Sequence, residues 1–275
     1  MIKKVIFICG AGHSGSTLLG LLLGSHPSSF YMGEAKKTLF LYDERKPEKK
    51  RYCKICGPDC KIWYPFYLAK KEGTSLYSTL EGIIGSHNVI DSSKDIRWIE
   101  RSILSIQEEQ RQAVLIYLKR DGRAVVNSRL RKYPNIPAEE HIQKWKQQIE
   151  KSNSLYESFS GNKFTVLYHQ LTKEPEKTLQ SICERVSISY EEEMMQFYKK
   201  KHHPLGGNDG TQSLLNQIRE KMNPENILLE SKRAYFTNHP QAIQHDSRWR
   251  EQFSVENEEL FYKMTATMNE SFQEC

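Results

Sequence analysis

The sequence lacks a long apolar run. Nowhere in its 275 residues does a stretch approach the ~20 apolar residues that a membrane-spanning helix needs, so neither a membrane segment nor a membrane partner is expected. The N-terminal stretch "MIKKVIFICGAG" carries two lysines before an apolar run. That run is too short for a signal peptide and continues directly into a glycine-rich loop. We therefore expect it to be the first strand of a cytoplasmic protein.

The sequence also lacks a large excess of charge of one sign and the composition typical of disordered proteins. The 40 Lys and Arg exceed the 34 Asp and Glu by only six, which favours anionic ligands weakly. Because the basic residues are spread along the chain, a nucleic-acid partner is not indicated. With 14 Tyr, 11 Phe and 4 Trp, the chain does not have the composition of a disordered protein. Its length suffices for one domain with a full core.

The glycine-rich loop "GAGHSGST" (residues 10–17) lacks the lysine of nucleotide hydrolases. It fits the pattern G-x-x-x-x-G-K-[ST] at Gly10, Gly15 and Thr17, but Ser16 stands where the lysine should be. An apolar strand precedes the loop and the helical pattern "STLLGLLLG" follows it. A strand, a glycine loop and a helix start offer backbone N–H groups and a positive helix end to an anion. The segment therefore favours phosphate binding over a plain turn.

Side chains of this loop add further donors. His13 is a candidate cationic donor, because a bound phosphate would favour its protonated form. Hydroxyl donors come from Ser14, Ser16 and Thr17.

Short apolar runs alternate with helical patterns along the chain. Strands are expected within residues 3–9, 87–95, 112–123 and 164–169. Helices are expected at 16–24, 96–111, 124–132, 138–160, from Pro175 onward, at 189–201 and at 255–272. This alternation predicts βαβ units, and hence an α/β fold with a central parallel sheet flanked by helices. We expect residues 1–275 to form a single domain.

Two more polar segments follow expected strands. In "LKRDGRAVVNSRLRK", Arg120 ends a strand and Ser128 lies in the next helix, so both belong to the carboxyl edge of the sheet, where α/β proteins bind ligands. Arg120 can take a second phosphate bidentately. Three further basic residues of the segment could assist it, namely Arg123, Arg129 and Lys132. A solvated basic helix is the alternative for this segment.

The other segment is "VIDSSKD", which places Lys94 behind a strand. A lysine at such an edge is a candidate electrophile. The alternative is a salt bridge to Asp91 or Asp95, which would contribute little.

Together these segments resemble the sulfotransferases that use 3′-phosphoadenosine 5′-phosphosulfate (PAPS), whose fold is related to nucleotide kinases and is P-loop-like. "GHSGSTLLGLLLGSHP" resembles their 5′-phosphosulfate loop, with His13 in the position of the family's Lys or Arg. Arg120 and Ser128, eight residues apart, match the 3′-phosphate motif. The resemblance assigns donor binding to the loop residues Gly12, His13, Ser14, Gly15, Ser16 and Thr17, and to Arg120, Ser128 and Lys132.

Within that family, "RDGRAVVNS" is similar to the tyrosylprotein sulfotransferases and their bacterial relatives, and "HDSRWREQFS" resembles the closing segment of bacterial members. The resemblance implies that Glu34 of "MGE" acts as base and that Lys94 is the catalytic lysine. It also implies in-line transfer of a sulfuryl group to a hydroxyl or amine, with charge stabilised by Lys94 and His13. In the alternative interpretation, Glu34 only caps or pairs with Lys36 or Lys37.

Residues of about 42–75 are expected to form an insertion or flap whose basic run "RKPEKKR" is solvated. The segment contains Cys53-x-x-Cys56-x-x-x-Cys60, a spacing that suits a metal knuckle, although no fourth ligand is visible nearby. A structural zinc site and three ordinary loop cysteines both stay open, and thiols are favoured over disulfides. The His-His-Pro sequence at 202–204 is expected to be loop structure rather than a metal site.

The expected acceptor is a small molecule such as a natural-product hydroxyl, and segments 36–75 and 202–215 are the candidate acceptor loops. Two other functions compete with sulfotransfer. A phosphate-loop kinase or NTPase predicts magnesium dependence and a lysine near the loop. A non-catalytic nucleotide- or RNA-binding module needs neither Glu34 nor Lys94.

Overall fold

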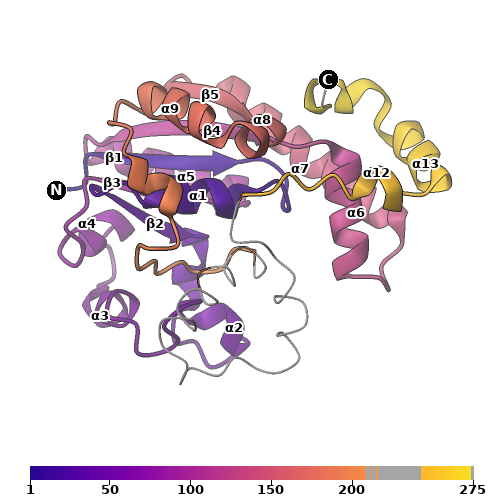
Figure 1. Ribbon diagram of the computed structural model, residues 1–275. Helices are drawn as coiled ribbons and strands as arrows, with labels where there is room; N and C mark the ends of the chain where they lie inside the picture. Colours follow the sequence, from indigo (N-terminus) through magenta and orange to yellow (C-terminus); the bar gives the residue numbers. More distant parts are fainter. Residues whose placement is uncertain (209–210, 212–214, 216–242, 274–275) are drawn as a thin grey trace.

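A five-stranded parallel sheet lies at the centre of the molecule (Figure 1). The structure is a computed structural model that describes residues 1–208, 211, 215 and 243–273. Its strands are β1 (Lys4–Cys9), β2 (Ser29–Gly33), β3 (Asn88–Asp91), β4 (Gln112–Lys119) and β5 (Asn162–Leu167). They lie in the order β2-β3-β1-β4-β5 and all pair in parallel. The expected α/β class is confirmed.

The central strands are apolar because both faces of the sheet are covered. All six residues of β1 are buried. Val5 and Phe7 join one hydrophobic cluster, whereas Ile6 and Ile8 join the cluster on the opposite face. Strands buried on both sides are continuous apolar runs rather than alternating ones. This explains why "VIFIC" and "AVLIYL" were recognisable as strands.

Helices cover each face of the sheet. On one face the buried residues come from α1 (Ser16–Gly24), α8 (Tyr168–Lys173), α9 (Pro175–Val186) and the 3₁₀ turn η2 (Glu192–Gln196). On the other face they come from α3 (Trp63–Ala69), α4 (Leu76–Glu81), α5 (Ile96–Glu108), α6 (Gly122–Lys132), α7 (Ala138–Ser158) and α13 (Val255–Thr265). The C-terminal α12 (Trp249–Gln252) and α13 lie beside α6 and α7 (Figure 1). Among the described residues, none of the helices has the length and apolar character to cross a membrane.

Two of the expected helices are wrong in part. In place of a helix over 189–201, the chain forms only the five-residue turn η2, which already brings Met194 and the following Phe197 into the buried cluster on this face of the sheet. The expected tail helix over 255–272 is divided. It ends at Thr265, and Ala266, with φ of +47°, turns the chain into the 3₁₀ helix η3 (Ala266–Phe272).

Segment 42–75 is partly solvated and partly core. The short α2 (Glu48–Arg51) buries none of its residues, as expected for the basic run. Trp63 and Phe66 of α3, however, are 0% and 1% exposed and pack into the same cluster as the central strands. The second half of the segment is therefore anchored to the sheet.

Candidate functional site

The sequence-predicted polar residues gather at the carboxyl edge of the sheet. The glycine loop follows β1, Glu34 follows β2, Lys94 follows β3 and Arg120 follows β4. Since parallel strands end at the same edge, four separate segments of the sequence meet there.

The glycine loop has a left-handed backbone conformation at Gly15. This residue is the N-cap of α1 with φ of +90°, a left-handed conformation that side chains rarely adopt. A Cβ atom there would lie 2.7 Å from the Tyr168 ring. The loop is held from outside by Gln148, whose Oε1 accepts from the Gly12 N–H at 3.2 Å. Asn208 N–H donates to Thr17 Oγ1 at 2.9 Å, so one loop hydroxyl already has a partner.

His13 joins the two expected phosphate motifs. Its Nδ1 lies 2.9 Å from Ser128 Oγ on α6, and its carbonyl accepts from Arg120 Nη1 at 2.9 Å. The residue has φ of +73°, a left-handed backbone that is uncommon outside glycine and clusters at functional sites.

The protein's own side chains disfavour a charge on His13. Burial, together with the guanidinium of Arg129 and other nearby cations, lowers the pKa of His13 to about 3. These surroundings favour a neutral ring near pH 7, so the cationic donor considered from the sequence depends on the charge of a bound phosphate.

Arg120 is a buried cation at the end of β4. Its guanidinium carbon lies 4.2 Å from the centroid of the Tyr168 ring, and Nη2 binds Asp246 Oδ2 at 3.2 Å. Arg120 Nε is buried and has no hydrogen-bond partner among the described residues. Sequence reasoning assigned no role to Tyr168 or Asp246. The only signal was "HDSRW", noted as a C-terminal motif that contains Asp246.

The other basic residues of this segment are used differently. Arg123 pairs with Asp121 at 2.8 Å and with Glu258 at 2.6 Å. Arg129 is buried and donates to the carbonyls of Gly12 and His141; its burial lowers its pKa to about 10. Arg123 and Arg129 thus make contacts within the protein, whereas Lys132 at the end of α6 is exposed.

Glu34 lies where β2 turns into the 3₁₀ helix η1 (Ala35–Phe40). Its Oε2 pairs with Lys37 Nζ at 2.9 Å, so the alternative ion pair considered for Glu34 does form. Its Oε1 accepts from the Gly207 N–H at 3.2 Å, and its own N–H donates to Leu205 O at 2.6 Å. The carboxylate is a third exposed, which leaves it accessible to a substrate.

Lys94 is oriented toward β1 rather than toward its acidic neighbours in sequence. Its Nζ donates to Ile8 O at 2.9 Å. Burial lowers the pKa of Lys94 to about 8, against the opposing effect of the nearby carboxylates of Glu34 and Asp91. Asp95, one of the two partners in the alternative interpretation of Lys94, instead binds Lys36 and caps α5 by accepting from the Trp98 N–H.

The three cysteines of segment 42–75 meet a fourth candidate ligand. His203 Nδ1 lies 3.3 Å from both Cys56 Sγ and Cys60 Sγ, and Cys53 completes the cluster. Residues 202–204 are loop structure, as expected, and His203 in addition supplies the fourth candidate ligand that the sequence did not indicate. The cysteines of the described residues are free thiols, as expected.

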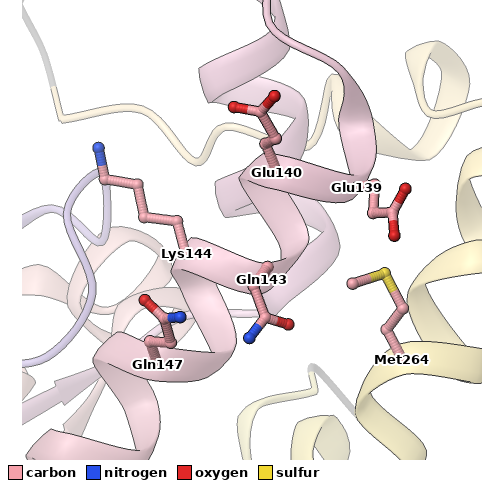
Figure 2. A pocket seen from close by; sticks show the side chains of 6 residues that line it. All are labelled: Glu139, Glu140, Gln143, Lys144, Gln147 and Met264. Atoms are coloured by element: carbon pink, nitrogen blue, oxygen red, sulfur yellow. The ribbon is translucent and has the colours of Figure 1, made fainter.

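A separate open hollow of about 610 Å³ lies along α7 (Figure 2). Residues of α7 line it, with Met264 of α13 on the other side. Among the residues lining the hollow, Lys144 is one of the cations that lower the pKa of His13. The hollow contains none of the residues predicted for catalysis.

Comparisons with known proteins bear on the family and the fold of the chain. The family model described as "Sulfotransferase family" matches residues 5–192. The fold is similar to the sulfotransferase domain of the Synechococcus PCC 7002 olefin synthase, at 18% identity and a TM-score of 0.52, over 96% of this chain and 94% of that one. It is also similar to the sulfotransferase domain of the curacin biosynthetic pathway, at 19% identity and 0.54, over 96% and 98%. None of the curated proteins matches the chain.

Proposed function

The chain belongs to the sulfotransferase family, and on that premise we propose that it moves a sulfuryl group from PAPS to a hydroxyl or amine of an acceptor. One observation carries the proposal. His13 of a lysine-free phosphate loop contacts Ser128 with its ring and Arg120 with its carbonyl, so candidate sites for both ends of the donor adjoin each other. A nucleoside triphosphate site would need a lysine in this loop for the β- and γ-phosphates.

The donor is proposed to bind in two places. Backbone N–H groups and hydroxyls of Gly12–Thr17, at the start of α1, hold the 5′-phosphosulfate. Arg120 and Ser128 hold the 3′-phosphate, with Lys132 adding a positive charge. The buried Arg120 Nε, which has no hydrogen-bond partner in the described part of the chain, supports this assignment, because an anionic oxygen would satisfy a donor that is otherwise costly to bury. The phosphate would replace Asp246 on Arg120.

Glu34 is proposed to accept the proton of the acceptor hydroxyl or amine. The acceptor atom then forms a bond to sulfur while the bond from sulfur to the 5′-phosphate oxygen breaks. The electron pair of that bond leaves with 3′-phosphoadenosine 5′-phosphate (PAP). As in phosphoryl transfer, positioning and charge stabilisation would supply the catalysis, with no covalent intermediate.

Lys94 and His13 are proposed to stabilise the charge that develops on the sulfuryl group and on the leaving phosphate. The lowered pKa of Lys94, about 8, still keeps much of this amino group protonated at pH 7. A dianionic phosphate beside His13 would raise its pKa above the value in this structure. Even a neutral imidazole retains one N–H to donate.

The acceptor is proposed to be a small molecule, and a natural product is the class we favour. Two similar structures are domains of an olefin synthase and of the curacin pathway, and both sources are biosynthetic. Both candidate acceptor segments contact Glu34. Lys37 of segment 36–75 forms an ion pair with its carboxylate, and Gly207 of segment 202–215 donates its N–H to the same group. Residues 209–210 and 212–214 of the second segment lie outside the described residues.

The test is to incubate the protein with PAPS carrying isotopically labelled sulfate and a metabolite extract, and to identify products by mass. A labelled organic product together with stoichiometric PAP is the expected result. Hydrolysis of ATP–Mg²⁺ without use of PAPS would instead identify a kinase or NTPase. PAP binding without transfer to any acceptor would indicate a non-catalytic nucleotide-binding module.

A further inference from the structure

Four side chains of the types that bind metal ions meet in the structure, from two segments that lie far apart in the sequence. Cys53, Cys56 and Cys60 come from one loop, and His203 comes 143 residues after the last of them. Their ligand atoms all lie within 4.8 Å of one another. His203 Nδ1 is 3.3 Å from two of the sulfur atoms. Because the contact joins separate segments, it is a product of the fold and not of local sequence.

These distances suit a tetrahedral ion. With metal bonds of about 2.3 Å to sulfur and 2.0 Å to nitrogen, ligand atoms around zinc lie roughly 3.5–3.8 Å apart. Closing the observed cluster onto an ion therefore needs shifts of only about an ångström or less. Three thiolates and one imidazole are a ligand set of structural zinc sites, and four protein ligands leave no open position for catalysis.

The backbone around the cysteines supports the same geometry. The Cys56 N–H donates to Cys53 Sγ at 3.5 Å, which stabilises a thiolate as ligand. Gly57, directly after the second cysteine, has φ of +70° and returns its N–H to Cys53 O at 3.1 Å. The tight turn therefore depends on the glycine. Cys53, Cys60 and His203 are 4%, 0% and 8% exposed, so three of the four candidate ligands are enclosed, and Cys56 is half-buried.

The cluster is linked to Glu34 through a short, fully hydrogen-bonded path. Lys54 N–H donates to Pro204 O at 3.0 Å, joining the cysteine loop to the histidine segment. One residue further, Leu205 N–H donates to Met32 O at 2.8 Å and Leu205 O accepts from Glu34 N–H. Two residues beyond that, Gly207 N–H reaches the Glu34 carboxylate.

We propose that Cys53, Cys56, Cys60 and His203 bind one Zn²⁺ ion, and that this ion fixes the segment 203–207 that positions Glu34. The metal is structural and takes no part in the transfer. The second half of the proposal rests on the proposed function of Glu34, whereas zinc binding does not. Joining the two segments through one ion closes a chain loop of more than 140 residues, so the metal would also stabilise the fold.

The first experiment measures metal content. Protein purified without chelator after growth in zinc-supplemented medium is expected to contain one equivalent of zinc per chain by mass spectrometry of the elements. Cys56→Ser and His203→Gln are expected to contain less than a fifth of an equivalent. The matched controls Cys183→Ala and His202→Gln, which alter a buried cysteine and a buried histidine outside the cluster, should keep the full equivalent.

The metal experiment also has outcomes that overturn the proposal. Zinc absent from the wild type, one equivalent of iron or copper in its place, or equal zinc in the His203→Gln variant each contradicts the assignment. If both ligand variants fail to fold, replacing zinc with Co²⁺ in the wild type gives an independent test. Tetrahedral cobalt with thiolate ligands absorbs visible light intensely, and the lack of that absorption would count against the site.

The second experiment tests the link to Glu34. His203→Gln is expected to lower kcat by about 10- to 100-fold, the cost of slight misplacement of a catalytic group. Its affinity for PAP should stay within about twofold, because the proposed PAP contacts come from the glycine loop, Arg120 at the end of β4 and α6, all outside segment 203–207. A zinc-free variant with wild-type kcat would refute the positioning role. A wild type that binds zinc but transfers no sulfate would refute the proposed function and leave the metal site standing.

Discussion

At the scale of single residues, His13 lies among several cations. Burial, the guanidinium of Arg129 and the charges of Lys132 and Arg120 lower its pKa to about 3, while in the unfolded chain the pKa stays near 6.5. Between these values the unfolded state binds more protons than the folded state. Stability from the neutral ring is therefore complete above pH 6.5 and is lost as the pH falls toward 3.

This charge difference predicts how acid acts on the protein. The His13→Gln variant should lose less free energy of unfolding between pH 7 and pH 4 than the wild type, because it lacks the group that must be protonated. Denaturant unfolding at a series of pH values measures the difference. His87→Gln, at an exposed histidine, serves as control. Its free energy of unfolding should depend on pH as that of the wild type does. Equal acid sensitivity of wild type and His13→Gln would contradict the burial argument.

Glu34 carries the chemical step in this account. Glu34→Gln keeps the side-chain shape and the Gly207 contact but cannot accept a proton, so kcat should fall by about 10²- to 10⁴-fold. The affinity for PAP should not change, because Glu34 is assigned to the acceptor side. Steady-state kinetics and calorimetry on the same preparations measure the two quantities, with the exposed Glu44→Gln as control. Full activity of Glu34→Gln would require a different base.

At the scale of elements, the sequence predicted an element correctly where the pattern of burial and the residues at its ends indicate the same bounds. The helix expected at 16–24 is α1, with the same bounds, because Gly15 turns the chain and nearly every side chain after it is buried. The helix expected at 189–201 is the five-residue turn η2 instead, because the apolar residues of this segment reach the buried cluster without a full helix and tertiary packing outweighs the helix-favouring charges at its ends. His203 could not be assigned from sequence, since its cysteine partners lie more than 140 positions away.

The element α3 provides a test of how segment 42–75 relates to the sheet. Because Trp63 is completely buried in the main cluster, Trp63→Ala should lower the free energy of unfolding by about 3–5 kcal/mol. If residues 1–275 form a single domain, as we propose, the change moves one cooperative transition monitored by circular dichroism. A separate early transition with the main midpoint unchanged would identify an independent flap. Tyr64→Ala, an exposed neighbour, is the control.

At the scale of the whole molecule, the fold joins segments that the sequence separates. The loop after β1, the start of η1, the loop after β3 and the end of β4 all meet at one edge of the sheet. A segment near residue 205 adds a bridge to Gly33, and the C-terminal region supplies Asp246 to Arg120. The edge follows from the parallel topology and was predictable. The contacts of the segment near residue 205 and of Asp246 depend on how long connecting segments fold back onto this edge. No local sequence pattern encodes that path.

The central claim is that this edge recognises a nucleotide with a 3′-phosphate through Arg120. Calorimetry of PAP and AMP binding to wild type, Arg120→Gln and the exposed control Arg131→Gln tests it most directly. PAP should bind the wild type and Arg131→Gln about 10- to 100-fold more tightly than AMP, as charged hydrogen bonds contribute. Arg120→Gln should remove most of that difference. Equal affinity of the wild type for PAP and AMP, or tighter binding of ATP–Mg²⁺ than of PAP, would contradict the account.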